Sequence, residues 1–335
     1  MQQKLLLNIL VFTFCVALNA QDIHYTQWMH APYQYNPAST GQFEGNHRFH
    51  FNHRNQWSSV TVPFLTFGAM VDSRTLLPVK GLHAMSSFLY DVTGDSKYTT
   101  IHFQLGVAYD IPLGLDSIFK WKIGMQTSVN QKRLSLLDLV FDDQFDGFLN
   151  NPSLGTNENL SRLSRSYFDI ALGSEWAIKM SDKMNINFGL SLFNILKPQQ
   201  GFYNDNAIIL NPRYNIMAQA DWKLDNKWIL HPGILYSSQA NYQSFNWGTL
   251  LSLDLSENIF FTQKLLLGGY IRSRDAGSLM VGYQYDAWKA MLSYDINYSD
   301  LVPASNYRGG LELALIYIIK NPTVRPLYKN CPDYL

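Results

Sequence analysis

Apolar and polar residues alternate at every second position over long stretches, and this alternation constrains the fold of the chain most. In RFHFNHRNQW (residues 48–57), Phe49 and Phe51 fall on one face and Arg48, Asn52 and Arg54 on the other. A period of two predicts β-strands with two unlike faces. The apolar face of such a strand meets either a protein core or lipid.

The alternation recurs and predicts about fourteen strands, an even number as in bacterial single-chain barrels. We expect them at residues 46–57, 63–73, 80–91, 98–111, 121–134, 165–179, 184–195, 211–222, 228–239, 246–254, 260–271, 278–286, 288–298 and 308–319. Many run for about ten residues, the length that crosses a bilayer, whereas soluble strands usually have roughly five or six.

Three features favour lipid as the apolar environment. Aromatic residues stand near the ends of apolar faces, as in the two girdles of outer-membrane barrels. Examples are Tyr109, Trp121, Trp222, Trp288 and Tyr298. The opposite faces are small or polar, and only 16% of residues are charged, against roughly 25% in typical domains. We therefore predict an all-β fold, a transmembrane antiparallel up-and-down outer-membrane β-barrel.

The polar faces would line the lumen. The predicted lumen-facing residues are Arg48, Asn52, Arg54, Glu175 and Glu312. The fifth, seventh and thirteenth connections are long (residues 135–164, 196–211 and 299–307), and the even-numbered ones are short. Because outer-membrane barrels have short periplasmic turns and longer outer loops, we expect the odd connections outside.

Three parts of the chain lie outside the predicted barrel of residues 46–319. Residues 1–20 are typical of a cleaved secretory signal peptide, with Lys4, an apolar run and small Ala20. An uncleaved anchor is the alternative, but the apolar run is short of the roughly 20 residues that a bilayer requires. Residues 21–45 would form either a periplasmic strap or a lumen plug, and residues 320–335 a periplasmic tail with Cys331.

Signals of catalysis are thin. The chain has no GxSxG, no HExxH and no phosphate-binding glycine loop, so we expect no enzyme and no cofactor. Its 26 basic and 26 acidic residues balance, so the chain has no net positive charge that would attract nucleic acid. His47 and His53 would share one strand face and His50 the other, an arrangement that disfavours a metal site.

The long fifth connection combines acidic and aromatic residues. The candidate partner-binding residues are Phe141, Asp142, Asp143, Phe145, Asp146 and Phe148. With Asp138 the acidic residues could hold calcium, although their spacing is not that of an EF-hand. Exposed aromatics on a long loop favour recognition of a partner, and a merely solvated acidic loop is the plainer alternative.

Several motifs occur in an order that resembles the PorP/SprF family: YTQWMHAPYQYNPASTG, HRNQWSSVTVPFLTF, VGYQYD and Cys331-Pro332. The matching residues are Asn36, Pro37, Ala38, Gln56, Trp57, Gly282, Tyr283, Tyr285 and Asp286. The resemblance implies an outer-membrane protein of the type IX secretion system that works by binding protein. It implies secretion components and a large adhesin-like client as partners, with a link to gliding in some members. The tail departs from the pattern, because it ends in CPDYL where many members have CP followed by Arg and Phe.

The leading hypothesis is a noncatalytic barrel that binds, helps export or anchors a secreted surface protein through that protein's C-terminal domain. The alternative is a porin-like channel for small solutes, in which charged residues of the lumen such as Lys122 would set selectivity. A membrane-embedded hydrolase and a soluble all-β protein are weaker alternatives.

Overall fold

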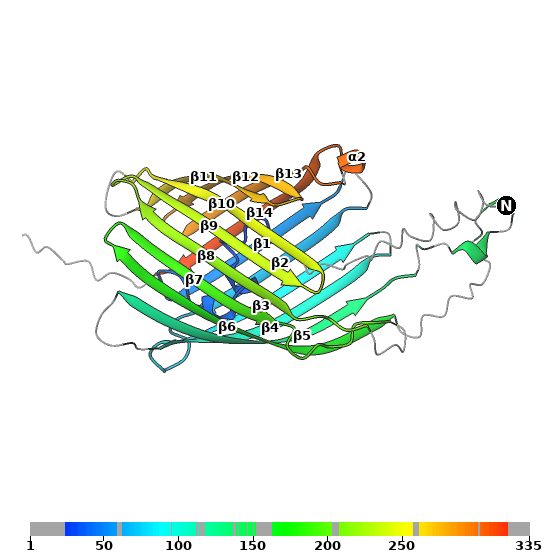
Figure 1. The fold of residues 1–335 in the computed structure, drawn as a ribbon, viewed down its shortest axis with the longest axis horizontal. Coiled ribbons are helices and arrows are strands. Elements are labelled where there is room, and N and C mark those ends of the chain that lie inside the picture. Colours follow the sequence, from blue (N-terminus) through cyan, green and yellow to red (C-terminus); the bar gives the residue numbers. More distant parts are fainter. Residues whose placement is uncertain are drawn as a thin grey trace, which may run out of the picture.

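The computed structural model is a closed barrel whose described part contains fourteen antiparallel strands, β1 to β14 (Figure 1). The structure describes residues 24–58, 62–94, 96–111, 113, 118–136, 139, 141–145, 147–149, 151, 163–202, 208–256, 261–300 and 302–320. The strands are β1 His47–Gln56, β2 Phe64–Ser73, β3 Leu82–Thr93, β4 Tyr98–Ile111, β5 Phe119–Arg133, β6 Ser164–Ser181, β7 Met184–Phe193, β8 Arg213–Lys223, β9 Trp228–Gln239, β10 Tyr242–Asp254, β11 Gln263–Arg272, β12 Ala276–Tyr285, β13 Trp288–Asn297 and β14 Arg308–Ile319. No helix within these described ranges is long and apolar enough to span a membrane.

Pairing of the first and last strands closes the sheet. The register of β1 on β14 runs from His47 opposite Ile319 to Gln56 opposite Gly310. Every other strand pairs with its neighbours in sequence. Closure leaves no unpaired strand edge, as a bilayer requires. The predicted outer-membrane barrel fold is confirmed.

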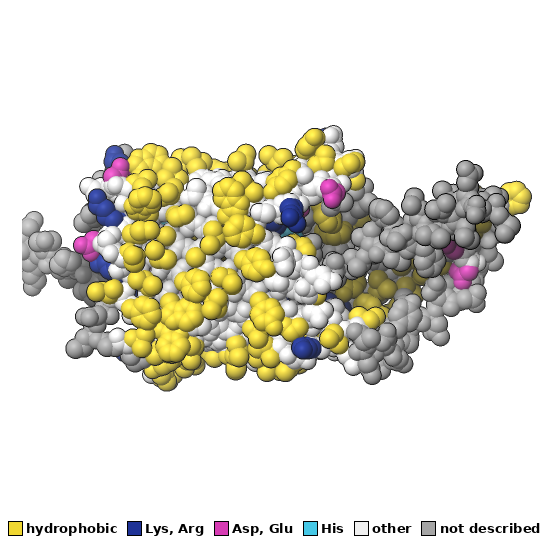
Figure 2. All heavy atoms as spheres, viewed as in Figure 1, with side chains coloured by type: hydrophobic (Ala, Val, Ile, Leu, Met, Phe, Trp, Pro, Cys, Tyr) yellow, Lys and Arg dark blue, Asp and Glu magenta, His cyan; other side chains and the backbone are white. Residues whose placement is uncertain are grey.

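The two faces of the strands separate as the alternation predicts. On β1, Arg48, Asn52 and Arg54 point inward and are buried, whereas 44% of Phe51 is exposed on the outside. Apolar side chains cover much of the outer wall (Figure 2). Glu175 on β6 and Glu312 on β14 are also buried on the lumen side.

The expected contrast between long odd and short even connections holds only in part. The three longest connections, residues 134–163, 194–212 and 298–307, do lie at one end of the barrel. The hairpins at residues 240–241 and 273–275 lie at that end too, yet they are shorter than the even-numbered connections at residues 74–81 and 255–262. We assign the end with the three long connections to the outside, because longer loops mark the outer face of such barrels.

Residues 24–45, here called the inner segment, run through the barrel interior, and Glu44 and Gly45 at the end of the segment line the periplasmic rim. This segment contains two short 3-10 helices, η1 Pro32–Gln34 and η2 Pro37–Ser39, each beginning at a proline. Proline suits the first position of a helical turn because that position needs no N–H donor. The segment runs from the outer half of the lumen at Thr26 to the periplasmic end at Gly41, where it continues into β1.

Candidate functional site

Apolar side chains of the inner segment pack against both sides of the barrel interior. Trp28 is 1% exposed and lies edge-on to Tyr270 of β11, with ring centroids 5.8 Å apart. Tyr25 and Tyr33 belong to a second buried cluster on β2 and β3, which includes Met70. Burial raises the pKa of Tyr25 well above its usual value, so its phenol stays neutral. The inner segment thus forms the core of the barrel.

The Asn36-Pro37-Ala38 motif occupies a slot that three glycines create on the barrel wall. A Cβ at Gly124 of β5 would lie 2.4 Å from the Ala38 amide nitrogen, and one at Gly173 of β6 would lie 2.0 Å from Asn36 Oδ1. A Cβ at Gly189 of β7 would lie 2.5 Å from Asn36 Nδ2. Only glycine therefore allows the motif to approach these three strands so closely.

Asn36 fixes this motif through two hydrogen bonds, one within the inner segment and one to the barrel wall. Its Oδ1 accepts a hydrogen bond from the Ala38 amide (3.0 Å), which makes Asn36 the N-cap of η2. Its Nδ2 donates to the Ser174 carbonyl of β6 (3.1 Å). Next along the segment, the Ser39 hydroxyl donates to Glu175 (2.7 Å), so a predicted lumen carboxylate contacts the inner segment directly.

Replacing Asn36 with alanine is expected to lower the free energy of unfolding by about 1–3 kcal/mol, because a cap is lost and buried groups lose partners. Urea titration of the barrel in detergent, followed by tryptophan fluorescence, measures this. Asn185→Ala is the control, since Asn185 is exposed on β7. Equal stabilities of the two variants would contradict the assigned role of Asn36.

A buried charged cluster joins the inner segment to the seam between β1 and β14. Arg54 pairs with Glu312 of β14 (3.0 Å) and with Asp295 of β13 (2.9 Å). The backbone amides of Thr26 and Gln27 donate to Glu312 at 2.7 and 3.1 Å. The two carboxylates therefore share one arginine, and the inner segment gives Glu312 two further hydrogen bonds.

The cluster extends to other strands. Asn52 donates to Glu312 (3.0 Å), and Arg272 of β11 donates to Asp295 (3.3 Å). The Thr26 hydroxyl donates to Asp295 and also contacts the Arg54 guanidinium. Asn52, Arg54 and Glu312 are thus brought together, although they lie far apart in the sequence.

A second ion pair fixes the periplasmic end of the inner segment. Arg48 of β1 donates twice to Asp72 of β2, at 2.8 and 2.9 Å, and the Gly41 amide donates to the same carboxylate (2.9 Å). Gly41 has φ +75°, a conformation that favours glycine, and His83 packs against it. Arg48 is therefore structural and is not free to face solvent.

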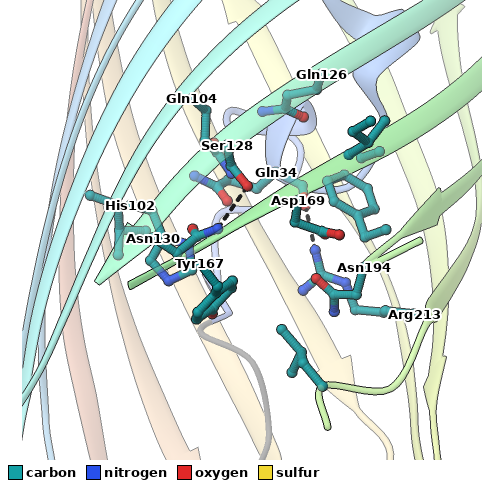
Figure 3. A pocket seen from close by; sticks show the side chains of 15 residues that line it. Gln34, His102, Gln104, Gln126, Ser128, Asn130, Tyr167, Asp169, Asn194 and Arg213 are labelled. Carbon is teal, nitrogen blue, oxygen red and sulfur yellow. Dashed lines mark hydrogen bonds between the residues drawn. The ribbon is translucent and has the colours of Figure 1, made fainter. Parts of the chain in front are cut away.

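A polar pocket remains in the outer half of the lumen, between Gln34 of η1 and strands β3 to β8 (Figure 3). It is lined by Gln34, Leu89, His102, Gln104, Gln126, Ser128, Asn130, Tyr167, Asp169, Ile170, Ala171, Phe193, Asn194, Leu210 and Arg213. Arg213 donates to the Gln34 carbonyl (3.0 Å), which fixes the floor of the pocket. Gln126 is buried, and neither atom of its amide has a hydrogen-bond partner among the described residues. The Gln126 amide is therefore an unsatisfied polar group enclosed in the lumen.

The candidate partner-binding residues lie on the connection between β5 and β6, at the outer end. Asp142 and Asp143 are exposed in η3 Asp142–Gln144, and Phe145 and Phe148 are 54% and 90% exposed. Phe141 is half-buried at the N-terminal side of η3. Asp138 and Asp146 lie outside the described residues. No group of three or more metal-ligating side chains occurs in the described part of the chain.

The other matching motif residues have structural positions. Gln56 ends β1, and Trp57 follows with φ +59° and packs on Phe64. A Cβ at Gly282 would collide with Met291. Further residues of the motif lie outside the lumen: Tyr283 and Tyr285 are exposed on the outer wall, and Asp286 is in the turn after β12. His50 faces the lumen, and His47 and His53 face outward.

Several residues of the lumen were not singled out from the sequence. Thr26, Gln27 and Asp72 contact the charged groups, and Gly124, Gly173 and Gly189 accommodate the motif. Asp295 also belongs to this set. The alternation places it on the polar face of β13, so this signal was present in the sequence.

The closed barrel and its apolar outer wall define an outer-membrane β-barrel protein. The chain belongs to the PorP/SprF family, whose model, described as a type IX secretion system membrane protein, matches residues 17–317. The resemblance found in the sequence is thereby confirmed. The family is that of a secretion-system membrane protein, and the barrel fold is shared with outer-membrane channels.

Solved structures with the same architecture include the CymD monoaromatic hydrocarbon channel, with a TM-score of 0.51 at 9% identity over 91% of this chain and 95% of that chain. The Ralstonia pickettii toluene transporter TbuX also has a TM-score of 0.51 at 9% identity, over 86% of this chain and 92% of that chain. At such low identity the likeness shows the fold alone. No curated protein sequence matches the chain significantly.

Proposed function

We propose that this barrel is a noncatalytic component of type IX secretion that binds a secreted surface protein at its outer mouth and helps to export or anchor it. The client would be adhesin-like and would bind through its C-terminal domain, and the periplasmic end would contact secretion components. A role in gliding would follow where the client is a motility adhesin.

The observation that carries this proposal is a fixed barrel with exposed aromatics on its longest connection. Phe145 and Phe148 are exposed at the outer end, next to acidic Asp142 and Asp143. Aromatic side chains, phenylalanine among them, are enriched in protein interfaces. The inner segment makes the barrel rigid. The barrel therefore loses little conformational entropy when a client binds.

The inner segment disfavours the porin-like alternative, because Trp28, Tyr33 and Tyr35 occupy the path that a solute would take.

The inner segment also bears on the predicted domains. We infer that residues 24–45 act as a lumen plug, with Asn36-Pro37-Ala38 as its central anchor. We keep cleavage after Ala20 and a periplasmic tail from residue 320 as proposals. Residues 1–20 and Cys331 lie outside the described residues.

Replacing Phe145 and Phe148 with serine together is expected to reduce the client that copurifies with the tagged barrel by about tenfold or more, because two aromatic anchors are lost. Quantitative mass spectrometry of gently solubilised outer membranes measures this. Leu224→Ser is the control, since Leu224 is an exposed apolar residue (45%) at the opposite end. Undiminished capture by the loop variant, or equal loss in the control, would refute the proposed contact.

A further inference from the structure

The outer wall carries an apolar groove across β2 to β5, with a volume of about 390 Å³. It is lined by Val71, Ser73, Leu76, Leu77, Ala84, Met85, Ser86, Leu105, Gly106, Val107, Met125 and Thr127. The lining is almost wholly apolar, and it belongs to the part of the wall that faces the bilayer. Annular lipid meets the whole wall, and this part of the wall is hollowed.

The register of the strands explains the hollow. Ser73 and Val71 of β2 lie opposite Ala84 and Ser86 of β3. On the other side of β3, Val107 and Leu105 of β4 lie opposite the same two residues. Directly opposed residues point to the same face of the sheet. The small side chains of Ala84 and Ser86 on β3 therefore lie lower than the larger side chains of Val71, Leu105 and Val107 beside them.

Both ends of the groove are defined. Toward the outside, Phe88 follows Ser86 on the same face and lies opposite Phe103. Toward the periplasm, Leu76 and Leu77 of the β2–β3 connection line the groove. The groove therefore begins at the periplasmic rim and ends within the wall, as a site for a single chain would.

The periplasmic end of this groove is basic. Leu77 also lines a broad hollow at the rim, and that hollow contains four cationic side chains. They are Arg74, Lys80, Lys120 and Lys320, of which Lys320 is paired with Asp286 (3.7 Å). The acids of the hollow are Glu44 and Asp110, and Asp110 is paired with His83 (2.9 Å) and Lys122 (3.6 Å). Arg74 is held at the rim by a hydrogen bond from Nη1 to the Phe43 carbonyl (2.9 Å).

We propose that this groove is a binding site for an anionic phospholipid of the periplasmic leaflet. One acyl chain lies over Ala84 and Ser86, and the phosphate contacts Arg74 and Lys80. Basic side chains at the membrane surface attract anionic headgroups, and an apolar groove that ends at such a group fits an amphiphile. A protein partner would require an interface of roughly 1,000 Å² or more, far wider than this groove.

Native mass spectrometry of the full barrel, with increasing phosphatidylglycerol or phosphatidylcholine in detergent, tests the proposal. We expect one phosphatidylglycerol to be retained about tenfold more strongly than phosphatidylcholine. Arg74→Gln with Lys80→Gln is expected to remove that preference. Ala84→Leu with Ser86→Leu fills the groove and is expected to remove retention of both lipids.

Matched controls separate this site from ordinary annular lipid. Lys183→Gln with Lys227→Gln changes two exposed cations on other periplasmic turns and is expected to retain the preference. Heat-dependent gel migration shows that each variant is folded. Equal retention of both lipids by the wild type, or undiminished retention in the filled variant, would overturn the site. A wild-type dimer that the filled variant abolishes would do so as well, because a second copy would then occupy the groove.

Discussion

Arg54→Met is expected to lower the free energy of unfolding by roughly 3–5 kcal/mol, the range for breaking a buried ion pair by removing one partner. Arg54 is 2% exposed, and its loss leaves Glu312 and Asp295, both also buried, without their shared cation. Urea titration in detergent with tryptophan fluorescence measures the change. Such a loss is large, because a domain is typically stable by about 5–15 kcal/mol.

Two further variants separate the buried charges from a general effect of losing a cation. Lys179→Met removes an exposed partner of Asp182 (2.6 Å), and it is expected to leave the urea midpoint nearly unchanged because solvent screens a surface ion pair. Combining Arg54→Met with Glu312→Gln is expected to recover part of the lost stability, because one buried charge is then neutral. A double variant that is less stable than Arg54→Met would contradict this account of the cluster.

Gly173→Leu is expected to open the lumen. The new side chain would overlap Asn36, since even a Cβ there lies 2.0 Å from Asn36 Oδ1, and the inner segment must move away. A barrel of fourteen strands without its inner segment encloses a wide space, so ions would pass. In planar bilayers we expect little current through the wild type and a severalfold increase in single-barrel conductance for the variant.

Gly277→Leu provides the control for this experiment. A Cβ at Gly277 meets nothing within 4 Å, so a leucine there should leave the lumen unchanged. Gly124→Leu should act like Gly173→Leu, because Gly124 contacts the same motif through Ala38. A conducting wild type would favour the porin-like alternative. Folded glycine variants that stay closed would show that the inner segment adapts without leaving its slot.

The strands were predictable because alternation is local and repeated. Each strand carries its own apolar–polar alternation. This alternation predicted which residues of β1, β6 and β14 face the lumen. Boundaries were less accurate where turns lack glycine or Asn-Gly. β10 begins at Tyr242 and not at residue 246, because residues 240–241 form a tight hairpin in which Ala240 adopts φ +49°. Alanine rarely adopts that conformation, so a two-residue turn was not predicted at this position.

The arrangement inside the barrel was not predictable in the same way. Both a strap and a plug fitted residues 21–45, since prolines and aromatics suit either one. The contact between Asn36 and Ser174, and that between Thr26 and Glu312, join residues far apart in the chain. A single sequence carries no local signal for such contacts. In the sequence, Gly124, Gly173 and Gly189 resemble the other small residues on the polar faces of the strands. Only the fold places the Asn36-Pro37-Ala38 motif against them.

The charged cluster at the seam has a consequence for the order of folding. Arg54 lies in the first strand, Glu312 in the last, and Thr26 before both. The carboxylate of Glu312 therefore finds its partners only when the two ends of the chain have met, and contacts of such long sequence separation form late. We therefore expect the inner segment to enter the lumen in the same cooperative step in which β14 pairs with β1. A barrel that closes without this segment would keep the ion pairs of Arg54 but would leave Glu312 without the backbone donors of Thr26 and Gln27, a cost that disfavours an empty barrel.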